Sequence, residues 1–99
     1  MSRPVKLISV KREPHNGKEF VARFRMSNGR EKLTRFGTSS NFLLNKAKTE
    51  QDRQAYIARH RVRENFANPT SAGALSRYIL WHTRSLRQNV ADYRKRFNL

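Results

Sequence analysis

The chain has no cysteine and no long apolar run, and these absences exclude several classes of protein. Without cysteine, its 99 residues can form no disulfide, no thiolate metal site and no thiol nucleophile, and a reducing compartment is allowed. No apolar stretch approaches the roughly 20 residues that cross a bilayer, and the N-terminus lacks the apolar core of a signal peptide. The sequence therefore predicts a soluble protein.

Acidic residues are also few, and their positions argue against catalysis. Glu50 and Asp52 are a closely spaced pair, but they lie where the first turn of a helix is expected. The positive end of the helix dipole stabilises acidic side chains there, which explains the pair without catalysis. His60 and Glu64 have i,i+4 spacing without a third metal ligand in view. The glycines lack the spacing and context of a nucleotide-binding loop. The sequence thus predicts no enzyme, no cofactor, no bound metal and no small-molecule substrate.

Basic residues are what the chain has in excess. There are 22 Lys and Arg against 7 Asp and Glu, giving a net charge of +15 and an isoelectric point near 11.6. Internal pairing cannot neutralise this excess, so a polyanion is the expected partner. Arg outnumbers Lys, as expected where planar contact with phosphate or carboxylate matters. Nucleic acid, an anionic lipid surface and an acidic protein surface all fit.

The first third of the chain has the pattern of three short strands. Residues Val5–Val10 are mostly apolar and lead to a turn signal at Pro14–Gly17. Residues Lys18–Met26 alternate between an apolar and a basic face. Asn28-Gly29 favours a tight hairpin turn with positive φ at both positions, before a third strand at Glu31–Phe36. The expected core face of the second strand consists of Phe20, Ala22, Phe24 and Met26.

The middle of the chain predicts a first helix from Thr49 to about Asn65. Thr49 and the acids that follow it resemble a capping box. Tyr56 is the one aromatic residue flanked by charge, so it is the aromatic most suited to face a ligand. The side chains expected to share one apolar face of this helix are Ala55, Ala58, Val62 and Phe66.

Two further helices are expected toward the C-terminus. Asn68-Pro69 suits an N-cap and first helical position, and the segment that it opens is apolar nearly all round as far as Trp81, which indicates a buried central helix. Ser85 caps the last helix, whose apolar stripe is Leu86, Val90, Tyr93 and Phe97. The chain is therefore expected to form a single domain over residues 1–99. Its fold class is α+β: a three-stranded antiparallel β-meander over 5–36 followed by three packed α-helices within 49–97.

Basic side chains on these elements are the candidates for polyanion binding. Contact between such side chains and phosphate releases counterions and gives affinity without sequence specificity. Both halves of the chain carry a large basic excess, which favours a broad electrostatic surface over one narrow recognition helix. Whether the charges converge on one face is left open. The candidates are Arg23, Arg25, Arg59, Arg61, Arg63, Arg87, Arg94, Lys95 and Arg96.

A resemblance to a known family extends over roughly Phe36 to Phe97. The residues that carry it read Tyr56-Ile57-x-Arg59-His60-x-x-Arg63-Glu64-Asn65-Phe66, then Pro69-x-x-Ala72-Gly73-Ala74-Leu75-Ser76-Arg77-Tyr78-Ile79-Leu80-Trp81, with Tyr93-x-x-Arg96-Phe97 at the end. In these residues the chain resembles a family of small basic proteins encoded by large double-stranded DNA viruses of algae and protists. The resemblance implies a viral origin and a place in the virion. It brings no catalytic residues.

Charge and resemblance together predict a non-enzymatic virion structural protein, acting as a minor capsid or internal component. Its expected partners are the acidic faces of other capsid and virion proteins, packaged DNA and the anionic surface of the inner membrane. Its expected location is the virion, and the host cytoplasm or nucleus during assembly. The alternative is a sequence-nonspecific DNA-binding protein that packages the genome, although the chain has none of the long Lys-rich or Gly-rich tails common in such proteins.

Overall fold

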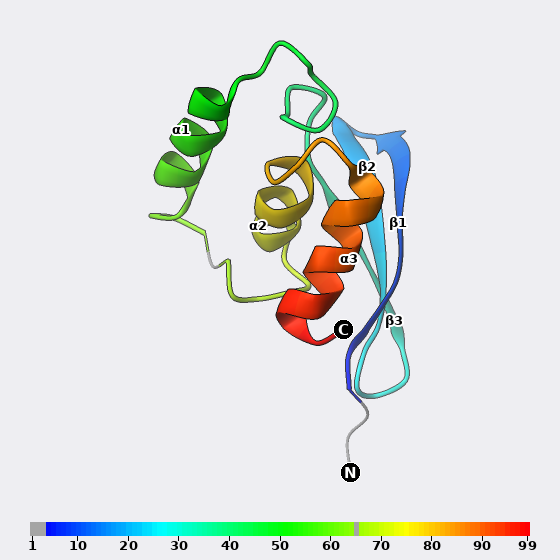
Figure 1. Ribbon diagram of the computed structural model, residues 1–99. Coiled ribbons are helices and arrows are strands. Elements are labelled where there is room, and N and C mark those ends of the chain that lie inside the picture. The colour runs from blue at the N-terminus through cyan, green and yellow to red at the C-terminus, as the bar shows by residue number, and fades with distance from the viewer. Residues whose placement is uncertain (1–3, 65) are drawn as a thin grey trace.

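The computed structural model describes residues 4–64 and 66–99 and shows an α+β fold (Figure 1). The strands β1 (Lys6–His15), β2 (Lys18–Arg25) and β3 (Glu31–Phe36) form an antiparallel sheet in the order β1-β2-β3. The helical elements follow: α1 (Glu50–His60), α2 (Ala72–Leu75), the π-helical turn η1 (Ser76–Leu80) and α3 (Leu86–Phe97). The predicted α+β class, with a meander before the helices, is confirmed.

The first hairpin turn is tighter, and β1 longer, than the sequence predicts. His15 pairs with Lys18, so the turn is the two-residue pair Asn16-Gly17, with φ of 50° and 81°. Positive φ at both positions is the requirement of a type I′ turn, which matches the twist of the flanking strands. β1 continues through Pro14, where the pairing register shifts. β1 is an edge strand, so one of its two sides has no neighbouring strand to which an N–H could donate. Proline, which has no N–H, is tolerated in such a strand.

The second hairpin differs from its prediction. Its loop has three residues between Met26 and Arg30, closed by a 2.8 Å bond from the Met26 N–H to the Arg30 carbonyl. Gly29 has φ of 84°, whereas Asn28 does not have positive φ. The expectation of positive φ at both positions of Asn28-Gly29 is therefore wrong. In a three-residue loop only the last position is left-handed, and glycine occupies it here.

The core lies between one face of the sheet and the segment α2–η1, with α3 beside them (Figure 1). Phe20, Ala22 and Phe24 of β2 are buried as predicted, and Met26 is half-buried. They pack in one cluster with the buried side chains of the helical part, which are Leu75, Ile79, Leu80, Trp81 and Tyr93.

The central segment is buried as predicted but begins later and contains a π-helical turn. Asn68 does not cap a helix, because its Oδ1 accepts hydrogen bonds from the backbone N–H and the hydroxyl of Thr70, which holds a turn. Ser71 is the cap, accepting from the Ala74 N–H, and α2 starts at Ala72. At the other end the Trp81 N–H donates to the Ser76 carbonyl at 3.1 Å, the i→i+5 spacing of a π-helix.

The first helix is shorter than predicted and turns a different face to the core. The capping box at Thr49 and Asp52 is present as expected, with the Thr49 N–H donating to the Asp52 carboxylate at 2.8 Å. However, α1 ends at His60 and has no buried residue, and Val62 is 80% exposed. The predicted face of Ala55, Ala58, Val62 and Phe66 is wrong; the predicted end, Asn65, lies outside the described residues.

Tyr56 supplies the contact that the alanines were expected to make. Its ring stacks on Trp81 with centroids 4.4 Å apart and rings within 6° of parallel. An aromatic pair buries far more area than an alanine stripe and adds a specific stacking term. The orientation of α1 therefore places Tyr56, rather than Ala55 and Ala58, against the core.

A fully buried amide joins α3 to the end of η1. The Asn89 side chain donates to the carbonyls of Ile79 at 2.7 Å and Thr83 at 2.9 Å, and its Oδ1 accepts from the Thr83 N–H and hydroxyl. The apolar stripe predicted for this helix is otherwise confirmed, with Tyr93 buried and Leu86, Val90 and Phe97 packed against the core.

The Asn89 network predicts a large stability loss for the isosteric change Asn89→Asp. The carboxylate cannot donate to the Ile79 and Thr83 carbonyls, and leaving a buried group unpaired costs about 1–3 kcal/mol each. Burial also raises the pKa of the new acid above its unfolded value, so stability is greatest below that unfolded pKa and is lost as the pH rises. Urea unfolding from acid to neutral pH measures this. Gln51→Glu is the exposed control, and equal stability of both variants would contradict the network.

Candidate polyanion-binding site

The outer face of the sheet carries the first group of candidates. Arg23 and Arg25 of β2 are exposed and alternate along the strand with the buried Ala22 and Phe24, so they lie on the opposite face of the sheet from the core. The strand register places Lys6 beside Arg25, and Lys11 and Arg35 on either side of Val21. Directly paired residues share one face of a sheet. Two of these cations are partly neutralised, since Arg23 lies 3.7 Å from Glu31 and Arg35 lies 3.8 Å from Glu13.

The second group lies at the C-terminal end of α1. Arg59 is in the last turn of the helix, and Arg61 and Arg63 follow in the next turn. All three are exposed, and none forms an ion pair with an acid in the part of the chain that the structure describes. The negative end of the helix dipole accommodates cations here without an acidic partner.

The third group, on α3, divides into free and engaged side chains. Arg87 and Lys95 are exposed. Arg94 donates to the Leu7 carbonyl at 3.0 Å and to the Ile8 carbonyl at 3.3 Å, so its guanidinium joins α3 to β1. This structural use leaves Arg94 less available for a polyanion than its sequence position indicates.

Arg96, also of α3, belongs to a cluster that the sequence pattern did not predict. Its guanidinium lies 4.2 Å from the centre of the Tyr78 ring, and Arg77 lies 4.7 Å from the same ring. Arg53 and Arg77 both donate to the Trp81 carbonyl. Burial lowers the pKa of Arg77, and the positive charges of Arg53 and Arg96 lower it further. The sequence offers no periodic signal for this cluster, because it joins three separate helical elements.

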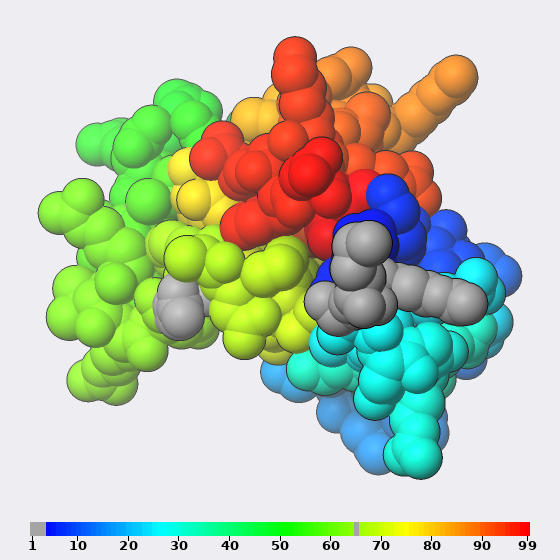
Figure 2. Space-filling view, turned by 90° about the horizontal axis from the view of Figure 1, so that it is seen from below, coloured from blue at the N-terminus to red at the C-terminus, as the bar shows by residue number. Residues whose placement is uncertain are grey.

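The candidate groups do not converge on one face. The sheet and α1 lie on opposite sides of α2 in Figure 1. In Figure 2 the C-terminal part of α3 lies between the segment around residue 60 and the strands. The basic surface is therefore divided among the outer sheet face, the end of α1 and α3.

The acids of the chain are already engaged, so they leave most of the positive charge uncompensated. Arg side chains pair with Glu13, Glu19, Glu31 and Glu50 at 2.9–3.8 Å. The remaining acids bond elsewhere: Asp52 to Thr49, Glu64 to His60 at 3.1 Å, and Asp92 to His82 at 3.0 Å. Such exposed pairs contribute little stability individually. The surplus of basic side chains has no internal acid left to neutralise it.

A cleft of about 390 Å³ separates α1 from the core. Tyr56 lines it, with one ring face on Trp81 and the other on His60 at a centroid distance of 4.0 Å. The sequence predicted Tyr56 as the aromatic most suited to face a ligand. Its ring is instead stacked on both faces by other side chains. Burial, followed by the nearby Glu64 carboxylate, raises the pKa of the Tyr56 hydroxyl to about 12.

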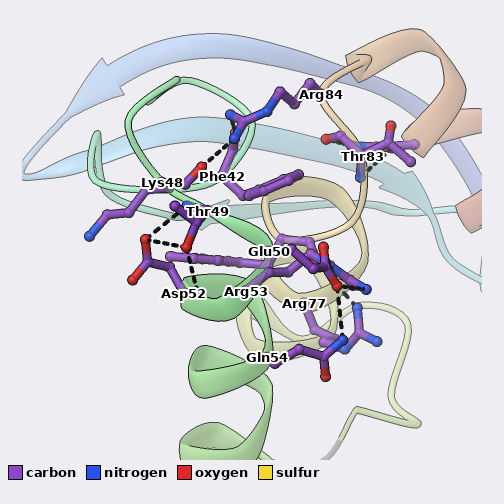
Figure 3. Close-up of polar contacts among 12 residues, drawn as sticks. Phe42, Lys48, Thr49, Glu50, Asp52, Arg53, Gln54, Arg77, Thr83 and Arg84 are labelled. Atoms are coloured by element: carbon purple, nitrogen blue, oxygen red, sulfur yellow. Dashed lines mark hydrogen bonds and ion pairs between the residues drawn. The ribbon is translucent and has the colours of Figure 1, made fainter.

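Arg84 binds the loop that leads into α1, and Thr38, Ser40 and Lys48 of this part of the chain line the cleft. It donates to the Phe42 carbonyl at 2.7 Å, the Asn45 carbonyl at 3.2 Å and the Lys48 carbonyl, and its guanidinium lies 3.9 Å from the Phe42 ring centre. Figure 3 shows this interaction beside the Thr49–Asp52 capping box, with the Lys48 side chain extending away from Arg84. Arg84 therefore determines where Lys48 and the start of α1 lie.

Within residues 4–64 and 66–99, no group of three His, Asp or Glu side chains is placed to hold a metal ion. In the same ranges, no helix has both the length and the apolar character needed to span a bilayer.

Comparisons with known proteins give no match. No protein-family model matches the chain, no curated protein is similar to it, and no solved structure resembles it. The resemblance to the viral family stays a prediction carried by the residues from Tyr56 to Phe97.

The raised pKa of Tyr56 predicts a loss of stability in alkali. A group whose folded pKa lies above its unfolded value of about 10 stabilises the fold below that value and loses this contribution as the pH rises. Stability should therefore fall between about pH 10 and the Tyr56 pKa of about 12. Urea unfolding followed through Trp81 fluorescence checks this. Tyr56→Phe should show a shallower fall over the same range, and an unchanged slope would contradict the assignment.

Proposed function

We propose that the protein is a non-enzymatic structural component of the virion of a large double-stranded DNA virus, which binds polyanionic neighbours through a divided basic surface. The observation that carries the polyanion part is the surplus of cations after every acid has found a partner. A surface that is basic on several sides is costly to a free monomer through self-repulsion. It becomes favourable when anionic groups surround it.

The distribution of charge supports contact with more than one neighbour. Arg23 and Arg25 belong to β2, and Arg61 and Arg63 follow the end of α1. The sheet and α1 lie on opposite sides of α2 (Figure 1). A sequence-reading protein instead concentrates its contacts on one element that enters a groove. The expected contacts are therefore sequence-independent.

The viral part of the proposal comes from the resemblance over Tyr56–Trp81 and Tyr93–Phe97. It assigns the protein to a minor capsid or internal position in the virion. The neighbours would be acidic faces of capsid proteins, packaged DNA or the anionic inner membrane, and assembly would take place in the host cytoplasm or nucleus.

A second candidate is a sequence-nonspecific DNA-binding protein that coats or packages the genome. The observation that favours it is the outer sheet face, where Lys6, Lys11, Arg23 and Arg25 are exposed without a covering helix. Such a face can follow a phosphate backbone without reading bases. The two candidates differ in the strength of DNA binding at physiological salt.

The proposal predicts salt-dependent, sequence-independent binding that several surfaces share. Binding of duplexes of unrelated sequence should weaken with salt, and the log–log slope should fall by about 0.9 for each phosphate that a variant no longer neutralises. Replacing Arg59, Arg61 and Arg63 together with Gln should reduce affinity and slope while leaving the melting temperature unchanged, because all three are exposed. Fluorescence anisotropy across a salt series measures this.

A matched variant tests whether the charge is shared. Lys11, Arg23 and Arg25 changed together to Gln remove the same charge from the outer sheet face. Partial weakening in both triple variants is the expected result, and complete loss of binding in only one would contradict a divided surface. Tight duplex binding at physiological salt favours the genome-packaging candidate, whereas binding that vanishes there favours protein or lipid neighbours.

A further inference from the structure

The cleft between α1 and the core gathers cations from three distant parts of the chain. Lys18 lies at the start of β2, Lys48 just before α1, and Arg59 in the last turn of α1, and all three line the cleft. None of these side chains forms a hydrogen bond or ion pair with another described residue. Like charges in one recess repel, so the arrangement is most favourable with an anion between them.

Two acids lie in or near the cleft. Glu64 lines it: its Oε1 is 3.1 Å from His60 Nδ1, and its Oε2 is buried without a hydrogen-bond partner. Asp52 is attracted to Lys48 and Arg59, but its carboxylate accepts hydrogen bonds from the Thr49 N–H and hydroxyl in the capping box. The lining thus places three cations against the single carboxylate of Glu64.

Other contacts fix the backbone positions from which two of the cations, Lys48 and Arg59, extend. Arg84 binds the Lys48 carbonyl and so fixes the backbone from which that side chain extends (Figure 3). The Tyr56–Trp81 stack holds α1, and with it Arg59, against the core. Fixed positions reduce the entropy lost when a ligand orders the side chains around it.

The remaining lining is suited to a phosphate that carries an aromatic group. Thr38 and Ser40 line the cleft, and their hydroxyls are potential donors to oxygen, whereas the Ser76 hydroxyl is hydrogen-bonded to Tyr56. The His60 ring, which stacks on Tyr56 and is 38% exposed, adds aromatic surface on which a nucleobase can pack. The volume of about 390 Å³ lies at the lower end of the roughly 300–1,000 Å³ of small-molecule sites.

We propose that this cleft binds the phosphomonoester of a nucleotide, with Lys18, Lys48 and Arg59 as its cationic ligands. A phosphomonoester carries up to two negative charges on three terminal oxygens, which matches three separate cations better than the single charge of a carboxylate. The nucleotide is either free or the 5′-phosphorylated end of a nucleic-acid strand, because both present the same chemistry. The site shares Arg59 with the proposed surface contacts, but it adds Lys18 and Lys48 and binds a phosphomonoester, whereas those contacts involve phosphodiesters.

The test is calorimetric titration with adenosine 5′-monophosphate, at a salt concentration that abolishes duplex binding. Trp81, the single tryptophan of the chain, lines the cleft and reports occupancy through its fluorescence. The nucleotide should bind and change this signal, whereas adenosine should not. Changing Lys18 and Lys48 together to Gln should weaken binding by roughly tenfold for each charge-assisted bond that is removed.

The control variant changes Arg30 and Lys46 to Gln, which removes two exposed cations outside the cleft. It should bind the nucleotide as the wild type does. Equal weakening in both double variants, or no nucleotide binding by the wild type, would overturn the site. Duplex binding at low salt is measured for the same Lys18/Lys48 variant. If duplex binding is retained while nucleotide binding fails, only the cleft site is overturned, and the proposed function stands.

Oligonucleotides distinguish the two sources of the phosphate. A single strand with a 5′-phosphate that binds more tightly than the same strand with a 5′-hydroxyl, in a manner that depends on Lys18 and Lys48, identifies strand ends as the ligand. A free nucleotide that binds at least as tightly as the phosphorylated strand identifies the nucleotide itself. Strands that bind equally with and without the phosphate, together with no binding of the nucleotide, contradict the proposal.

Discussion

Burial of the segment Ala72–Trp81 is the constraint on which the rest of the structure depends. The inner face of the meander packs on Leu75, Ile79 and Leu80, α3 packs beside them through Tyr93, and α1 is held by the stack of Tyr56 on Trp81. A three-stranded sheet is not stable alone and needs such a cover. Because α1 has no buried residue, its position depends on this stack, on the bond from Arg53 to the Trp81 carbonyl and on Arg84, which binds the loop before the helix.

The same packing explains how a strongly basic chain uses its arginines in two ways. Arg84 and Arg94 donate to backbone carbonyls, and Arg77 and Arg96 lie over the Tyr78 ring. In these places the guanidinium acts as a multiple hydrogen-bond donor and as a flat group that packs on aromatic rings. Other exposed cations, among them Arg59, Arg61 and Arg63, form no ion pair with a described acid, and they give the surface its charge. Some arginines thus stabilise the fold, and other arginines are those that we propose to bind polyanions.

The sequence predicted the order of elements well where a local pattern determines it. The alternation in β2, the capping box at Thr49 and the stripe on α3 are local signals, and each has its counterpart in the structure. The errors arose where long-range interactions decide. The face of α1 is chosen by Trp81, which is distant in sequence, and the start of the central helix is displaced by the turn that Asn68 makes with Thr70.

The candidate site was predictable in composition but not in arrangement. Net charge indicated a polyanion partner, yet no sequence pattern shows that Arg94 binds β1 or that Arg53, Arg77 and Arg96 meet. The cleft was not predicted for the same reason, since Lys18, Lys48 and Arg59 come together only through the tertiary fold. The buried amide of Asn89 was not predicted either, because a polar residue within an apolar stripe gives no signal that it bonds two carbonyls of another element.

The central claim is that polyanions bind several separate basic surfaces, and amide chemical-shift mapping tests it most directly. The protein, at 11.7 kDa, is small enough for complete assignment, and duplex DNA of arbitrary sequence can be titrated at low salt. The account predicts shifts on the outer face of β2, around Arg59–Arg63 and along the exposed side of α3, with little change around Leu75 and Ile79. Shifts confined to one of these surfaces would contradict it.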